Sequence, residues 1–411
     1  MTNTDMMIAP LLDAANADDI ISSSLSFVRQ HLGMEVAYLS EFVGDDLVFR
    51  AVDASGLEDM IDVGQSMPLE QVYCRHILEG RLPEMIPNTE LEPLAQDIAL
   101  THAVPIKSHV SVPIRRRDGT PYGMFCCMSR QTQTNLNDRD LEVMRAFANL
   151  SADQINDTIS LRTQEEELRA TIVNIIETQS FDIALQPIMD ISGRRPVGFE
   201  ALCRFQAEPY RPPNLWFDDA HTVGLQADLE LCVIKVALEA LNHLPDDIYV
   251  SVNASPATVE TGRIGELFEP YAPHRIVLEV TEHAEITDAE LLLDQLLLMR
   301  AAGIRLAVDD AGAGYSGLQQ IVRLQPDIIK LDISLTTGVD SDVVRRSLAG
   351  ALVRFATETG AKIVAEGIET EGELATLREL CVPLGQGYLL GRPSDLESAK
   401  AWFGNAWRES A

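Results

Sequence analysis

The sequence is poor in basic residues. The 411-residue chain carries 32 lysines and arginines against 63 aspartates and glutamates, so its formal net charge is −31. Such an excess of negative charge repels nucleic-acid backbones and anionic lipids, and we therefore expect neither nucleic-acid nor membrane partners bound through a broad basic face. An anionic substrate would need a local source of positive charge, which divalent metal ions and a few arginines can supply.

Long apolar runs and regularly spaced cysteines are also missing. No run reaches about 18 apolar residues, and the N-terminus has no basic segment followed by an apolar one, so we expect a cytoplasmic protein. The six cysteines show no zinc-ligand spacing and mostly lie in apolar runs, which favours buried, reduced thiols. The length suggests two domains, one of them a barrel of about 200 to 250 residues.

The first third of the chain has the pattern of a small α+β domain. Residues 20–32 are amphipathic, and turn residues separate two pairs of β-rich runs, 36–42 from 47–52 and 110–115 from 122–128. We predict a helix and two hairpins from these patterns.

Residues 138–178 contain no proline or glycine and predict one long helix. Apolar residues recur at heptad-like spacing, but Gln154, Asp157 and Gln164 occupy seam positions, which favours a helix that pairs weakly in a homodimer and carries a signal between domains. The alternative is a single linker helix packed on its own domains. We predict domains at 1–150, 151–178 (the linker) and 179–411.

From residue 181 to 403 apolar strands alternate with helices, and helices are expected to begin near Ser341 and Thr370. Sustained alternation over this length favours an α/β TIM-like (β/α)8 barrel of parallel strands, in which polar side chains at the carboxyl ends of the strands share one mouth. Seven polar residues directly follow six apolar runs: Glu200, Asn253, Glu279, Asp309, Asp310, Lys330 and Glu366.

This part of the chain resembles the EAL family of cyclic di-GMP phosphodiesterases over residues 170–403. The matching motifs are LQPIMD (185–190), EALCR (200–204), VNAS (252–255), LEVTE (278–282), DDAGAGYSGL (309–318), PDIIKLD (326–332), AEGIET (365–370) and GQGYLLGRP (385–393). The resemblance implies a phosphodiesterase that opens cyclic di-GMP to linear pGpG by two-metal catalysis. The main alternative is a catalytically silent cyclic di-GMP receptor.

The resemblance also assigns roles to individual residues. Two Mg²⁺ or Mn²⁺ ions per active site would be held by oxygen atoms, since no histidine occupies these positions. The implied metal ligands are Glu200, Asn253, Glu279, Asp309, Asp310 and Glu366. Lys330 would orient the attacking water, and Glu200, Asp309, Asp310 and Glu366 would share in catalysis.

Other positions are implied to bind substrate or to support the active-site loop. Gln186, Leu202, Arg204 and Gln386 match positions in the substrate cleft, and Glu282 matches the residue that anchors the loop. Ala311, Ala313 and Gly317 depart from the family's usual loop residues. Read without the resemblance, Lys330 would form a salt bridge to Asp332 or Glu366, and the two glutamines would satisfy buried backbone groups.

Two further patterns leave alternatives open. Residues 312–317 spell a G-x-G-x-x-G motif, but the preceding aspartates would repel a pyrophosphate, so we expect it not to bind a dinucleotide cofactor. The first third of the chain resembles a GAF domain through LGMEVAYLSEF, SHVSVPIRRRDGTPYGMFCCMS and DRDLEVMRAFANLSADQI, which implies either a sensor for an unidentified small molecule or a dimerisation module. Cys74 and His76 within it fit either a chromophore or haem contact or, as we favour, a helix with a core cysteine and a surface histidine.

Overall fold

The computed structural model describes residues 17–54, 57, 61–207, 210–280, 289–311, 321 and 323–403, with the backbone alone described at 17, 18, 310 and 311. Its contacts form two compact units, Met1–Gln164 and Glu165–Ala411. The division falls inside helix α6 (Asp138–Thr178), whose bounds agree with the predicted long helix. Within the described residues, no helix has both the length and the apolar character of a membrane span.

The first unit is built on a six-stranded sheet in the order β3-β2-β1-β6-β5-β4. Its strands are β1 (Val36–Val43), β2 (Asp46–Asp53), β3 (Ser66–Pro68), β4 (Met85–Ile86), β5 (Ser108–Arg115) and β6 (Pro121–Ser129). All of its pairings are antiparallel, and β1–β2 and β5–β6 form the two predicted hairpins. This confirms the α+β prediction.

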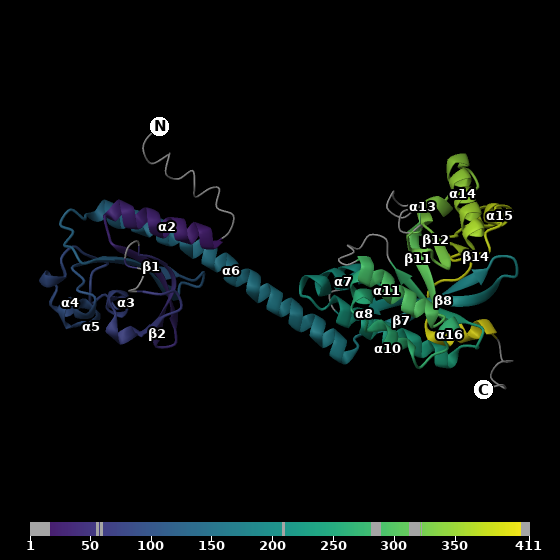
Figure 1. The fold of residues 1–411 in the computed structure, drawn as a ribbon, viewed down its shortest axis with the longest axis horizontal. Helices are drawn as coiled ribbons and strands as arrows, with labels where there is room; N and C mark the ends of the chain where they lie inside the picture. Colours follow the sequence, from purple (N-terminus) through teal and green to yellow (C-terminus); the bar gives the residue numbers. More distant parts are fainter. Residues whose placement is uncertain are drawn as a thin grey trace. The chain divides into compact units, whose positions relative to one another are not determined.

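Two layers of helices cover the sheet of the first unit. On one face α2 (Ala17–Leu32) lies beside the first half of α6, as Figure 1 shows, and the rings of Phe27 and Phe147 lie 4.9 Å apart between centroids. The other face carries the short elements η2 (Leu69–Gln71), α3 (Tyr73–Leu78), η3 (Thr89–Leu91), α4 (Pro93–Asp97) and α5 (Ala99–Ala103). Because both faces are covered, each face has its own hydrophobic core.

The second unit is a closed barrel of eight strands. In chain order they are β7 (Phe181–Asp190), β8 (Arg195–Phe205), β9 (Tyr249–Ala254), β10 (Ile276–Val280), β11 (Arg305–Ala311), β12 (Ile328–Leu331), β13 (Lys362–Ala365) and β14 (Leu384–Gly385). The predicted barrel is confirmed, but β7 runs antiparallel to both β8 and β14. A tight turn explains this exception, since the Asp190 carboxylate accepts hydrogen bonds from the Ser192 and Gly193 amides and leaves no room for a crossover helix.

Helices surround the barrel. They are α7 (Pro213–Thr222), α8 (Gln226–Leu238), η4 (Glu239–His243), α9 (Pro256–Glu260), α10 (Ile264–Phe268), η5 (Pro273–Arg275), α11 (Ala289–Ala301), α13 (Ile333–Thr336), α14 (Val343–Thr359), α15 (Glu371–Glu379), α16 (Leu396–Lys400) and η6 (Ala401–Phe403). Thr370 caps α15 as predicted. The Ser341 prediction was off by one residue, because the Asp342 carboxylate binds the free amides at the start of α14.

All six cysteines are free thiols. Cys74, Cys126, Cys127 and Cys203 are buried as predicted, and Cys232 is half-buried. Cys381 contradicts the expectation of burial. It follows α15 with φ of 61° and is exposed, because the turn directs it away from the core.

Candidate active site

The ammonium group of Lys330 lies at the centre of four carboxylates. Its Nζ atom is 2.7 Å from an oxygen of Glu279 and 2.7 Å from one of Glu366, and 3.4 Å from oxygens of Glu200 and Asp309. Lys330 and Glu279 are each 1% exposed. The barrel therefore brings together residues that are far apart in the sequence: Glu200 and Glu366, which are 166 residues apart, both contact Lys330.

Successive strands supply these side chains. Asn253 lies on β9, Glu279 on β10, Asp309 on β11 and Lys330 on β12, and Glu366 directly follows β13. The predicted position of Glu200 needs correction. It lies in the middle of β8, not at its end, because the hairpin partner β7 extends the pairing through Phe205.

Hydrogen bonds orient Glu200 from both sides. Asn253 Nδ2 donates to its Oε1 atom at 3.2 Å, and Gln386 Nε2 donates to its Oε2 atom at 2.6 Å. Gln386 also donates to Gln186, which in turn donates to the carbonyl oxygen of Gly391 at 3.2 Å. The two glutamines thus contact the site, and Gln186 in addition satisfies a backbone group.

Ser251 is a site residue that the sequence reasoning missed. Its hydroxyl donates to Oε1 of Glu279 from the neighbouring strand, and Ser251 is fully buried. The parallel register places Ser251 beside Val277, two residues before Glu279, so the two side chains share the barrel's interior. Its spacing of two residues before Asn253 in an alternating strand was the signal available in the sequence.

A second missed residue is Glu230 on α8. It is buried, and its carboxylate accepts hydrogen bonds from the amide and hydroxyl of Ser255 at 2.8 and 3.0 Å. These bonds hold the turn that directly follows β9 and therefore the end of the strand that carries Asn253. No local pattern marks this contact, because 25 residues separate Glu230 from Ser255.

The concentration of charge shifts the pKa values of the site. Burial raises the pKa of Glu279 to about 7 and that of Glu366 to about 8, against the opposing effect of Lys330. For Glu200 burial is outweighed by Lys330 and the bonds from Gln386 and Asn253, so its pKa lies below the usual value. Burial alone would lower the pKa of Lys330, but its carboxylate neighbours raise it well above the usual value.

Two cavities adjoin the cluster and share Leu202 in their walls. One, of about 360 Å³, is lined by Gln186, Glu200, Glu366 and Gln386 among others. The other, of about 310 Å³, reaches Asn253 and Arg204. One Arg204 nitrogen donates to the carbonyl oxygen of Cys203 at 2.8 Å, so the rest of its guanidinium remains available to a ligand in that cavity.

The donor set fits hard divalent cations. The converging ligands are carboxylate and amide oxygens, which Mg²⁺ and Mn²⁺ prefer. In the described residues no group of three or more acidic, histidine or cysteine side chains already forms a metal cage. The Lys330 ammonium lies where the carboxylates converge and balances part of their charge.

Several predicted positions fall outside what the structure describes. Glu282, Ala313, Gly317 and the G-x-G-x-x-G segment lie among residues 281–288 and 312–320, and only the backbone of Asp310 and Ala311 is described. Asp332, a predicted alternative partner of Lys330, instead caps α13 by accepting from the Ser334 amide. Glu366, the other alternative partner, does pair with Lys330.

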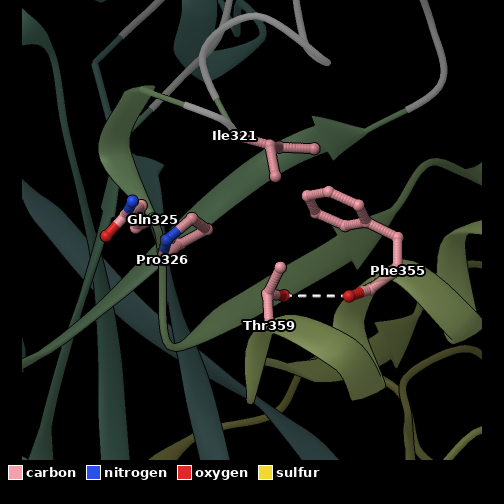
Figure 2. Close-up of a pocket in the computed structure, with 5 residues that line it drawn as sticks. All are labelled: Ile321, Gln325, Pro326, Phe355 and Thr359. Carbon is pink, nitrogen blue, oxygen red and sulfur yellow. Dashed lines mark hydrogen bonds between the residues drawn. The ribbon is translucent and has the colours of Figure 1, made fainter.

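A separate cavity of about 330 Å³ lies at the opposite, amino-terminal ends of β12 and β13. Figure 2 shows its wall, with the Phe355 ring facing Ile321 and with Thr359 bonded to the carbonyl oxygen of Phe355. Pro326 and Gln325 complete the described wall. The cavity contains no acidic or basic side chain among these residues, so it has no part in the carboxylate site.

In the first unit, Cys74 lies on α3 and packs in the hydrophobic core, and His76 on the same helix is half-buried. The expected core cysteine is confirmed, but the expected surface position of His76 is wrong, because packing of the helix covers its Nδ1 atom.

Comparison with known proteins identifies both units. Residues 165–393 match the EAL domain model and residues 14–156 match the GAF domain model. The chain is 29% identical over 259 residues to the probable cyclic di-GMP phosphodiesterase PdeA of Escherichia coli, covering 60% of this chain and 35% of that protein. It is 28% identical over 255 residues to the cyclic di-GMP phosphodiesterase NbdA of Pseudomonas aeruginosa, covering 59% and 32%.

The barrel is also similar to a solved structure of a phosphodiesterase. The PaMucR phosphodiesterase in complex with c-di-GMP superposes with a TM-score of 0.52 at 26% identity, covering 57% of this chain and 99% of that one. The chain spans about a third of the length of the curated relatives it matches. Since the EAL match includes all eight barrel strands, the chain belongs to the EAL domain family of cyclic di-GMP phosphodiesterases, with a GAF domain before the barrel.

Proposed function

We propose that the barrel hydrolyses cyclic di-GMP to linear pGpG. The observation that carries this proposal is the meeting of four carboxylates, one amide and one lysine from successive strands of the barrel. This combination suits the hydrolysis of a phosphodiester, because cations held by the carboxylates would compensate negative charge on the phosphate and activate a water molecule.

Glu200, Asn253, Glu279, Asp309 and Glu366 would hold two Mg²⁺ or Mn²⁺ ions, with Asp310 as a further ligand. Two such cations, when bound, act as Lewis acids that activate water and neutralise charge on the phosphate. Hydrogen bonds from Gln386 and Ser251 hold the Glu200 and Glu279 carboxylates in fixed orientations, so these side chains lose little further freedom on binding.

In the proposed reaction the oxygen of water attacks phosphorus and the bond from phosphorus to the 3′ oxygen breaks. The phosphate remains on the 5′ oxygen, and the released 3′ oxygen takes a proton, which gives pGpG. Lys330 would donate a hydrogen bond that orients the attacking water, since its ammonium is held rigidly and remains charged. Arg204 would bind a phosphate oxygen with its free guanidinium donors.

The shape of the site favours a substrate with two halves. The two cavities meet at Leu202 and both reach the metal-ligand side chains, one at Glu200 and Glu366 and the other at Asn253. A cyclic dinucleotide has one nucleotide for each cavity and a phosphodiester between them. We propose that Gln186 and Gln386 contact the half that lies in the larger cavity.

The test is to incubate the purified chain with cyclic di-GMP, with and without Mg²⁺ or Mn²⁺, and to separate the products by chromatography. We expect pGpG only with metal, and none from Glu200→Ala. The matched control is Glu266→Ala, an exposed glutamate on α10 that should leave turnover unchanged. Saturable binding without pGpG from the parent chain and from the isolated barrel would contradict the enzyme and favour a silent receptor.

We further propose that the GAF domain regulates the barrel through α6 in a homodimer, with a sensor at 1–150, a linker at 151–178 and a catalytic domain at 179–411. One helix contributes Met144 and Ala148 to the core of the first unit and Ile172 and Ile175 to that of the second, which supports transmission along it. If deletion of residues 1–160 changes neither the turnover rate nor the oligomeric state in solution, this regulatory proposal is wrong.

A further inference from the structure

An arginine-lined cavity in the GAF domain has no role in the function proposed above. It has a volume of about 440 Å³ and lies between the end of β5, the turn that follows it and the first half of α6. Four arginines line it, namely Arg115, Arg116, Arg117 and Arg145. The volume is within the usual range of small-molecule sites, which begins at about 300 Å³.

The charge of this cavity is opposite to that of the whole chain. The chain has a formal net charge of −31, but only two acidic residues, Glu84 and Asp153, accompany the four arginines in the cavity wall. Positive charges gathered in a concave surface attract an anion more strongly than the same charges spread over a convex one. The wall therefore selects for a negatively charged ligand.

Two of the arginines are already neutralised. Arg145 contacts Glu84 and Glu142, each at 2.7 Å, and Arg117 contacts Asp157 at 2.6 Å. The Arg117–Asp157 pair joins the hairpin to α6, and the Arg145–Glu84 pair joins α6 to the loop before β4. The Arg145–Glu142 pair lies within α6. Their role is to fix the shape of the wall.

The other two carry positive charge without a carboxylate partner. Arg115 donates to the carbonyl oxygen of Gly119 at 2.9 Å, and the guanidinium of Arg116 lies 5.3 Å from the centroid of the Tyr122 ring. Among the described residues, neither forms an ion pair within 4.0 Å. Each guanidinium has five N–H donors, so most of the donors of both remain available to a ligand.

The remaining wall is rigid and partly apolar. Asn156 on α6 donates to the carbonyl oxygen of Arg115 at 3.1 Å and accepts from the amide of Arg117 at 3.2 Å, which joins both sides of the cavity. Val112, Pro113, Ala148 and Ala152 provide an apolar surface. A ligand that suits this wall has an anionic group for the arginines and a less polar body.

Among the described residues, a cavity on the opposite face of the sheet is much smaller. A cavity lined by Val36, Leu57, Ile106 and Met128 has a volume of only about 10 Å³, enough for roughly one water molecule. The core there is filled by side chains such as Tyr38 and Tyr73. The arginine cavity is thus the better-formed of these two sites.

We propose that this cavity is a binding site for a small phosphorylated molecule, held by Arg115 and Arg116. Guanidinium groups bind phosphate oxygens through paired, charge-assisted hydrogen bonds, and two of them together match the charge of about −2 on a phosphate monoester better than the single charge of a carboxylate. Since residues 145–156 of α6 form one wall, the ligand contacts the helix that continues into the barrel.

The test is calorimetric titration of the full chain, without divalent metal, with inorganic phosphate, GMP and guanosine. We expect saturable binding of GMP and phosphate that weakens with added salt, and none of guanosine. The R115A/R116A double variant should bind GMP at least about tenfold more weakly, as expected for the loss of charge-assisted bonds. The control R81A removes an exposed arginine paired with Glu79 outside the cavity and should bind like the parent.

The double variant also separates this site from the barrel. GMP bound in the barrel would keep its affinity in R115A/R116A, and that result would overturn the proposal. Absence of saturable GMP binding by the parent would overturn it as well. Arg115 is exposed and Arg116 is half-buried. An unchanged thermal unfolding profile of R115A/R116A shows that its lost affinity does not reflect lost structure. If that profile changes, R115K/R116K is the second test, and it should also bind GMP more weakly because it keeps both charges but loses the paired guanidinium donors.

Discussion

Replacement of Lys330 by methionine tests the electrostatic account of the site most directly. The change preserves much of the side-chain volume but removes the one positive charge that four carboxylates surround. Removing one partner of a buried ion pair costs about 3–5 kcal/mol, because the remaining charges stay buried without compensation. For a unit of this size that loss corresponds to a fall of roughly 6–20 °C in the Tm of the barrel.

Divalent cations should reverse part of this loss. They bind the folded carboxylates and stabilise the variant by about 2.7 kcal/mol at one hundred times their Kd. Turnover should not return, since Lys330 would orient the water, and we expect a fall in kcat of about a hundredfold or more. The Lys330→Met chain therefore becomes strongly metal-dependent in stability and nearly inactive in catalysis.

The assay is thermal unfolding with and without Mn²⁺, together with the chromatographic assay of pGpG. The matched control is Lys362→Met, which removes an exposed lysine from the neighbouring strand β13. If metal-free Lys330→Met unfolds at the same temperature as this control, the charge of Lys330 does not stabilise the cluster and the reasoning fails. Turnover equal to that of the parent would refute its catalytic role.

Three further predictions concern other parts of the barrel. In the metal-free protein Glu279 and Glu366 have pKa values of about 7 and about 8, above the usual 4.5, so the folded state binds more protons than the unfolded state. Their contribution to the free energy of unfolding should therefore fall as pH rises from about 4.5 to 8, measured by urea titration, and a flat profile would contradict it. Ser251→Ala should weaken Mn²⁺ binding about tenfold by freeing the Glu279 carboxylate, with Ser251→Thr as the rescue variant in calorimetry. Glu373→Gln should lower the free energy of unfolding by about 1–3 kcal/mol, because the carboxylate accepts bonds from three backbone amides. Since those bonds lower the pKa of Glu373, the difference from the parent should vanish in acid, and a difference that persists there would argue against it.

Local patterns in the sequence determined the elements of this protein and much of its site. Turn residues between β-rich runs predicted both GAF hairpins, and the absence of helix-breaking residues predicted α6 to its observed bounds. The succession of apolar runs ending in polar residues predicted a barrel and named all of the side chains around Lys330. These features depend on neighbours a few residues apart, which a single sequence displays.

Only the tertiary structure decided how the elements close and which groups touch. The direction of β7 follows from a hairpin at Asp190, which places Glu200 inside a strand, where alternation points its side chain into the barrel. Glu230 acts through Ser255, 25 residues away, and no local pattern identifies it. The alternation in β9 shows that Ser251 shares a face with Asn253, but only the structure shows its hydrogen bond to Glu279 on the next strand. The arginine cavity likewise arises where a hairpin meets a helix. Contacts of this kind depend on barrel closure and packing, which bring distant residues together through the burial of apolar surface and not through any property of their immediate neighbours.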